Sequence, residues 1–129
     1  ITVEKLESVL LKAMQYLHMI KRDFVFQFRK NQFRISCDDI VYFEKKGRQA
    51  VIHTISENFK ANMTTEEIWK QLDDKVFAHI HVSHIINLGH IRAIEGDEVV
   101  MDNEERLLIA RSHKQNLKEK HMEFVRRMV

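Results

Sequence analysis

The chain has 129 residues, of which 44% are hydrophobic and 31% charged, and its formal net charge at pH 7 is +2; this length fits a single domain with a hydrophobic core of its own. Its one cysteine excludes an internal disulfide and a paired-cysteine zinc or redox site, and its three scattered glycines exclude a P-loop or dinucleotide-binding loop. No apolar run reaches the about 18 residues of a membrane span, and the first residues do not have the pattern of a signal peptide, so we expect a cytoplasmic protein without membrane contact.

The first predicted element is a helix over residues 3–20. Apolar side chains recur there at three- and four-residue steps and form one stripe. Such a helix either packs on its own domain, or links to an upstream domain, or pairs with a second copy of the chain. Because the sequence starts at Ile1 rather than Met, we expect a fragment of a longer protein. We divide it into a linker or dimerisation helix, residues 1–22, and a domain, residues 23–129.

From Phe24 onward the apolar period changes to two, which is typical of strands. Phe24, Phe26 and Phe28 share one face. Further strands are predicted at about 8–10-residue spacing, with polar turns between them. They cover residues 33–36, 40–44, 50–55 and 59–63, with a loop over 45–49 around Gly47.

Two helices and three more strands complete the prediction. Thr64 and Glu67 fit a capping box that opens a short helix, and Ser112 and Gln115 fit a second one that opens a basic C-terminal helix. A hairpin joins residues 91–94 to 98–101, and a last strand covers 106–110. The fold class is therefore mainly β, with small antiparallel sheets and short helices.

The charge is unevenly distributed along the chain. Residues 95–105 contain six acidic and no basic residues, a net charge of −6, whereas residues 106–129 carry a net charge of +5. Residues 45–48 add three positive charges in four positions. A nearly neutral total can thus hide a basic face suited to a polyanion, and we expect the acidic hairpin to point away from such a partner.

Enzymatic chemistry has little support. Cys37 precedes Asp38 and Asp39, and neighbouring carboxylates raise a thiol pKa, which does not suit a nucleophile. His79, His81 and His84 could contribute to a metal site, but no metal-binding motif accompanies them. We predict no catalytic residues, no metal and no cofactor, and keep a metal-dependent enzyme at these histidines as a minor hypothesis.

Basic loops give a better signal. Lys45, Lys46 and Arg48 lie in one inter-strand loop with Gln49 beside them. Arg111 closes the last strand just before Ser112, where a helix begins, and Lys114 lies in the first turn of that helix. Free backbone N–H groups at a helix start bind phosphate, and an arginine fork holds phosphate or reads guanine.

The order of these features resembles the LytTR-type DNA-binding domain. The resemblance covers residues 24–120 and rests on Ile40-Val41-Tyr42-Phe43-Glu44, on His81-x-Ser83-x-Ile85-Ile86-Asn87, and on Ala110-Arg111. It implies a mainly β fold and a bacterial transcription factor, usually the output domain of a two-component response regulator. In that family, loops enter successive major grooves of double-stranded DNA, which bends.

Carried over residue by residue, the resemblance implies three DNA-facing places. One is the loop containing Lys46, where Arg48 or Gln49 matches a base-reading position. The second is the turn His81–Ser83, where Val82 replaces an asparagine of some members and removes a hydrogen-bond donor. The third is Arg111, with phosphate contacts expected from Ser112, Lys114 and Lys46. For Asn87 we expect a structural role in a turn.

The resemblance also implies partners. The expected ligand is double-stranded DNA with direct repeats in a promoter, and a receiver domain is expected upstream of residues 1–22. The alternatives are a receiverless regulator that forms a homodimer through the helix at 3–20, and a protein-interaction module in which DNA contact is lost. Val82 is the feature that keeps the last alternative open.

Overall fold

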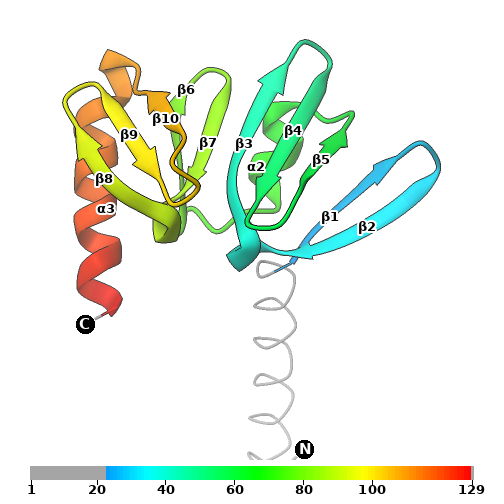
Figure 1. The fold of residues 1–129 in the computed structure, drawn as a ribbon, viewed down its shortest axis with the longest axis horizontal. Coiled ribbons are helices and arrows are strands. Elements are labelled where there is room, and N and C mark those ends of the chain that lie inside the picture. The colour runs from blue at the N-terminus through cyan, green and yellow to red at the C-terminus, as the bar shows by residue number, and fades with distance from the viewer. Residues whose placement is uncertain (1–22, 129) are drawn as a thin grey trace, which may run out of the picture.

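The computed structural model describes residues 23–128, so the helix predicted at residues 3–20 lies outside the described residues. The strands form three small antiparallel sheets of two, five and three strands (Figure 1), as predicted for a mainly β fold. The two-stranded sheet consists of β1 (Asp23–Phe28) and β2 (Asn31–Ser36). The five-stranded sheet has the order β5 (Asn58–Ala61), β4 (Gln49–Thr54), β3 (Ile40–Lys46), β7 (His84–Asn87), β6 (Phe77–His81). The three-stranded sheet has the order β10 (Arg106–Leu108), β9 (Glu98–Met101), β8 (Ile91–Glu95).

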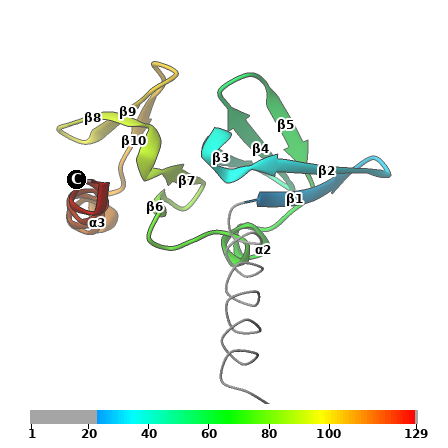
Figure 2. The same ribbon diagram turned by 90° about the horizontal axis from the view of Figure 1, so that it is seen from below.

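Short helices connect or flank these sheets. The α-helices are α2 (Thr65–Lys70) and α3 (Lys114–Met128), and the 3-10 turns are η1 (Cys37–Asp39), η2 (Leu88–His90) and η3 (Arg111–His113). The capping box predicted at the start of α2 is confirmed, since the Thr64 hydroxyl accepts from the Glu67 N–H and the Glu67 carboxylate accepts from the Thr64 N–H. Figure 2 shows α2 below the five-stranded sheet and α3 beside the three-stranded one.

β3 is the central strand and is buried on both faces. Ile40 and Phe43 belong to a core cluster with Phe24, Phe26 and the buried face of α2, whereas Val41 and Tyr42 belong to a second cluster with β6, β9 and α3. A strand buried on both sides reads as a continuous apolar run, and residues 40–43 are such a run. This one strand therefore joins the two cores.

The predicted structural role of Asn87 is confirmed. Its buried amide nitrogen donates to the backbone oxygens of Cys37 (3.1 Å) and Ile40 (2.9 Å). Its side-chain oxygen accepts from the N–H of Gly89 at 2.8 Å, which caps η2. One side chain thus ties the entry of β3 to the end of β7.

Several strand boundaries differ from the prediction. β3 runs to Lys46 and β4 begins at Gln49, so the predicted loop over 45–49 is a two-residue turn of Gly47 and Arg48. Gly47 has φ +61°, a left-handed conformation that glycine adopts without steric cost and that suits a tight hairpin. At the other end of the chain, β10 stops at Leu108 rather than at residue 110.

We predict that Asn87→Ala destabilises the domain strongly. The substitution leaves the Cys37 and Ile40 carbonyls and the Gly89 N–H without their partner, and unsatisfied buried groups of this kind cost about 1–3 kcal/mol each, so the free energy of unfolding should fall by at least about 3 kcal/mol. Urea unfolding measures this. Thr64→Ala, which removes only an exposed helix cap, is the control and should cost about 1 kcal/mol. An Asn87 variant no less stable than the Thr64 variant would contradict the assigned role.

Candidate nucleic-acid interface

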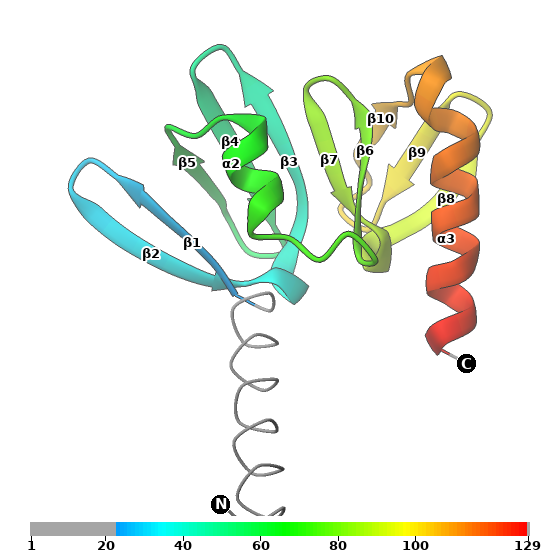
Figure 3. The same ribbon diagram turned by 180° about the vertical axis from the view of Figure 1, so that it is seen from behind.

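The three predicted DNA-facing loops end along one edge of the molecule. Figures 1 and 3 show the β3–β4 turn, the β6–β7 turn and the chain between β10 and α3 at the same upper edge. Two backbone hydrogen bonds connect them. The Lys45 N–H donates to the Ser83 oxygen at 2.8 Å, and the Ala110 N–H donates to the Ile80 oxygen at 2.7 Å. The fold therefore brings together segments that are 30 to 38 residues apart in sequence.

In the β3–β4 turn, the predicted side chains are exposed. Arg48 and Gln49 are open to solvent, and Lys46 lies 3.4 Å from the carboxylate of Glu44. Lys45 faces elsewhere, because its ammonium donates to the Met63 oxygen at 2.7 Å. Of the two neighbouring lysines, the structure thus leaves Lys46 at the loop surface.

The β6–β7 turn presents Val82, whose side chain is 82% exposed. Around it, Ser83 forms hydrogen bonds with both flanking histidines. Its N–H donates to His81 Nδ1 at 3.2 Å, and its hydroxyl lies 3.0 Å from that nitrogen and 3.1 Å from His84 Nδ1. Because an accepting ring nitrogen carries no hydrogen, the neutral His81 ring holds its proton on Nε2. That N–H makes no hydrogen bond within residues 23–128 and is free to act as a donor.

His84 belongs to a hydrogen-bonded group centred on Glu44. The carboxylate of Glu44 lies 3.4 Å from Nε2 of His84 and 3.4 Å from Nε2 of His53, and His53 stacks on Tyr42 with the ring centroids 4.1 Å apart. Burial alone would raise the pKa of Glu44, but hydrogen bonds from His53 and Lys46 and the charges of Lys46 and His84 lower it overall. No sequence pattern predicted this group, because Glu44 lies on β3 and His53 on β4.

The third loop carries Arg111, Ser112 and Lys114. Arg111 and Ser112 are exposed in η3, directly before α3. The prediction of a second capping box is wrong. The N-cap position is Ala110, which makes no side-chain bond, and Gln115 donates to Glu119 at 3.1 Å instead. Ser112 therefore lies within the 3-10 turn rather than at its N-cap, and its hydroxyl caps no backbone N–H group there.

The acidic hairpin lies beside the third loop. Its tip residue Asp97 reaches the third loop, with its carboxylate 2.8 Å from Lys114 Nζ and its backbone oxygen accepting from Ile109 at 2.7 Å. The hydrogen bond and charge of Lys114, together with the charge of Arg111, hold the pKa of Asp97 below its ordinary value despite opposing desolvation. The remaining hairpin charge is partly balanced nearby, since Arg106 lies 3.0 Å from Glu95.

A shallow groove of about 410 Å³ connects the second and third loops. Leu108, which sequence analysis missed, is 60% exposed there because Leu107 takes the inward position of β10. The pairing of β10 with β9 sets which of the two leucines points inward, and the sequence pattern alone did not predict that pairing. The residues lining the groove are His81, Asp97, Leu108, Ile109, Ala110, Arg111 and Lys114.

The histidines of the metal hypothesis do not converge. His79 packs on Trp69, with the centroids 4.3 Å apart, whereas His81 and His84 bond Ser83. Among the described residues, no group of three or more His, Cys, Asp or Glu is arranged to hold a metal ion. Burial, followed by the charges of Asp23 and Asp38, raises the pKa of Cys37 to about 12, which suits a structural thiol.

Comparison with known proteins agrees with this geometry. Residues 30–122 match the profile of the LytTr DNA-binding domain family. The chain belongs to the LytTr family. It is 30% identical over 99 residues to the heme-containing CO-sensing transcriptional regulator RcoM 2 of Paraburkholderia xenovorans (strain LB400), covering 71% of this chain and 37% of that protein.

The fold also matches a solved LytTr structure. The LytTr DNA-binding domain of a putative methyl-accepting/DNA response regulator from Bacillus cereus superposes with a TM-score of 0.68 at 21% identity, covering 78% of this chain and 96% of that one. The LytTr family is one of DNA-binding domains and not of enzymes. Within residues 23–128, no helix has the length and apolar character needed to cross a bilayer.

We predict that His84 makes the stability of this LytTr domain pH-dependent. Burial lowers the pKa of His84 more than the charge and hydrogen bond of Glu44 raise it, with the charges of His81 and His53 also lowering it. A lowered folded-state pKa contributes stability that is present above the ordinary value of 6.5 and lost as pH falls through the folded value.

The measurement is the free energy of unfolding between pH 8 and pH 5, in the absence of DNA. The wild-type domain should lose stability over this range, and His84→Gln should lose less because glutamine does not titrate. Equal pH dependence of the two proteins would contradict the assignment.

Proposed function

We propose that this LytTr domain binds duplex DNA in a sequence-specific manner and serves as the DNA-binding part of a bacterial transcriptional regulator in the cytoplasm. The observation that supports this most is the meeting of three loops from distant parts of the chain at one edge, joined by the Lys45–Ser83 and Ala110–Ile80 hydrogen bonds. Loops held by a rigid scaffold are suited to reach into a groove.

Within this proposal, Arg48, Gln49 and Arg111 read or grip bases. Their side chains are exposed, and no ion pair ties Arg48 or Arg111 within residues 23–128, so both guanidinium groups are free for a bidentate contact. Lys46, Ser112 and Lys114 contact phosphates. In the β6–β7 turn, Val82 meets a thymine methyl and the free Nε2–H of His81 donates to a base or a phosphate.

The upstream context is also part of the proposal. A receiver domain would make the protein a two-component response regulator acting on direct repeats. The Paraburkholderia relative is by name a heme-containing CO-sensing regulator, and this suggests another arrangement, in which a sensor of a different kind takes the place of the receiver. The chain spans 37% of that relative's length, which leaves room for such a domain there. A homodimer formed through residues 1–22 is compatible with either arrangement.

The second candidate function is a protein-interaction module. The observation that favours it is the exposure of Val82 (82%) and Leu108 (60%), two apolar side chains at the same edge. If the edge bound a protein instead of DNA, these side chains would form the centre of the interface, and Arg111→Ala would leave the affinity for DNA unchanged. The DNA-binding proposal makes the opposite prediction for Arg111.

We predict that Arg111→Ala weakens binding to a duplex selected from a random pool by about 1–3 kcal/mol, and weakens binding to random DNA much less. The reason is the loss of the Arg111 guanidinium, which would donate two hydrogen bonds to a base in the major groove of the DNA. Fluorescence anisotropy at fixed salt measures both affinities. Arg106→Ala is the matched control, because Arg106 is also exposed but is paired with Glu95 on the acidic hairpin. Equal losses on both duplexes would leave Arg111 a phosphate contact only, and no loss would favour the protein-interaction module.

We predict that Asp97→Asn strengthens DNA binding and steepens its salt dependence. The substitution frees Lys114 from the 2.8 Å ion pair and removes a negative charge beside Arg111. One additional phosphate contact should change the slope of log affinity against log salt by up to about 0.9. Asp102→Asn is the control, since Asp102 pairs with His90 instead. Unchanged affinity and slope would show that Asp97 lies outside the interface.

A further inference from the structure

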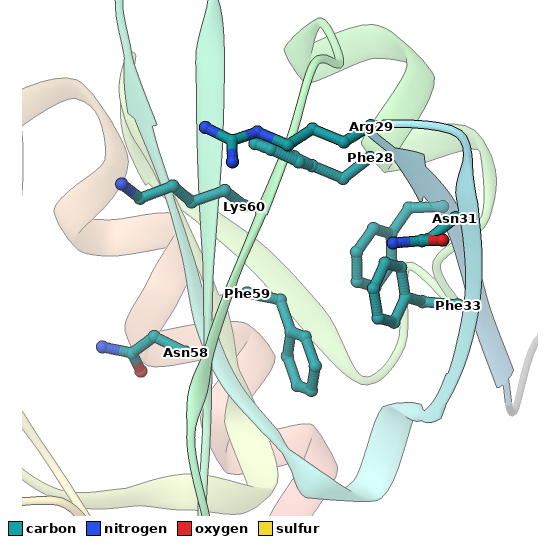
Figure 4. A pocket seen from close by; sticks show the side chains of 8 residues that line it. Phe28, Arg29, Asn31, Phe33, Asn58, Phe59 and Lys60 are labelled. Carbon is teal, nitrogen blue, oxygen red and sulfur yellow. The ribbon is translucent and has the colours of Figure 1, made fainter.

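A second cavity, of about 340 Å³, lies between the β1–β2 hairpin and the edge strand β5. It shares no residue with the three loops at the candidate interface. Figure 4 shows its side chains, with Arg29 lying along Phe28 on one side and Phe33 and Phe59 on the other. The lining residues are Phe26, Phe28, Arg29, Asn31, Phe33, Asn58, Phe59 and Lys60.

The inner wall of this cavity is aromatic. Phe33 stacks on the buried Phe26 with ring centroids 4.9 Å apart and an interplanar angle of 11°, and Phe59 meets the edge of Phe26 at 5.7 Å. Phe33 and Phe59 are only half buried. Their rings therefore offer apolar surface on which a further planar ring can pack, in an offset or edge-to-face arrangement.

The rim of the cavity is cationic. Arg29 and Lys60 are exposed, and neither takes part in an ion pair within residues 23–128. The guanidinium of Arg29 lies 5.2 Å from the centre of the Phe28 ring, which holds it over the aromatic wall. Asn31 and Asn58 add amide groups, and no acidic side chain lines the cavity. The charge at the rim is uncompensated.

The turn that carries Arg29 supports a binding role. Arg29 and Lys30 have φ values of 51° and 70°, the left-handed conformation that hairpin turns normally assign to asparagine and glycine. The chain thus keeps two bulky basic residues where small ones would be less strained, and strain of this kind is characteristic of functional sites.

We propose that this cavity binds a small aromatic carboxylate. The ring of the ligand packs on Phe33 and Phe59, and its carboxylate lies at the edge of β5. There it accepts hydrogen bonds from Arg29 and from Lys60, whose side chain leaves β5 on the side opposite to Phe59 (Figure 4). Ligand pockets range from about 300 to 1,000 Å³, so this cavity suits a ligand of one or two fused rings. Apolar walls with a few placed polar groups are the usual composition of such sites.

The test uses 2-naphthoate as the probe, with neutral 2-naphthamide as its matched partner, titrated into the isotope-labelled domain and followed by amide chemical shifts. We expect naphthoate to shift the amides of residues 28–31 and 58–60 and to bind at least several-fold more tightly than naphthamide. Equal binding of the two, shifts centred on Arg111 instead, or no saturable shift would overturn the proposal. Inorganic phosphate that binds as well as naphthoate would also overturn it, since that result needs no aromatic wall.

A variant pair tests the residues. Arg29→Gln combined with Lys60→Gln should weaken naphthoate binding about tenfold or more, because charge-assisted hydrogen bonds are lost. Both side chains are exposed, so the fold should be retained, which the spectra check directly. Lys30→Gln is the control, because Lys30 belongs to the same turn but does not line the cavity. A control that loses as much affinity as the double variant would show a general charge effect and contradict the site.

Discussion

The burial of β3 on both faces is the constraint on which the rest of the structure depends. Because Val41 and Tyr42 pack into one core and Ile40 and Phe43 into the other, a one-residue shift of β3 would move each of these side chains into the other core, where its shape does not match the packing. Its pairing with β4 and with β7 is thereby fixed. The ends of these two pairings meet at the same edge, where the Lys45 N–H reaches the Ser83 oxygen.

The third loop joins that edge through β6 and the hairpin of the three-stranded sheet. The Ala110 N–H donates a hydrogen bond to the backbone oxygen of Ile80, and the Ile109 N–H donates one to the backbone oxygen of Asp97. The second contact has an electrostatic consequence, since it places a carboxylate among the basic groups of the proposed interface. Basic and acidic side chains are therefore adjacent in space. The small net charge of the chain is the sum of positive and negative groups that share one surface, rather than of two oppositely charged faces.

Local signals predicted local features well. The alternation from Phe24 and the spacing of the strands gave the mainly β class, and Thr64 and Glu67, three residues apart, predicted their capping box. The family motif predicted the turn role of Asn87. Features that depend on distant contacts could not be read in this way. Ser112 fitted a capping pattern, but the Ala110–Ile80 bond fixes the chain just before it and the helix begins with a 3-10 turn. The position of Asp97 depends on Ile109, and no sequence pattern encodes that pairing.

The measurement that tests the proposed interface most directly is selection of DNA from a random duplex pool, carried out with the wild-type domain and with two variants. If separate loops read separate parts of the site, Arg111→Ala should lose sequence preference in one segment of the selected site and Arg48→Ala with Gln49→Ala in another, with the two segments about one helical turn apart. Failure of the wild-type domain to enrich any sequence, or uniform relaxation of the whole site in both variants, would contradict the account.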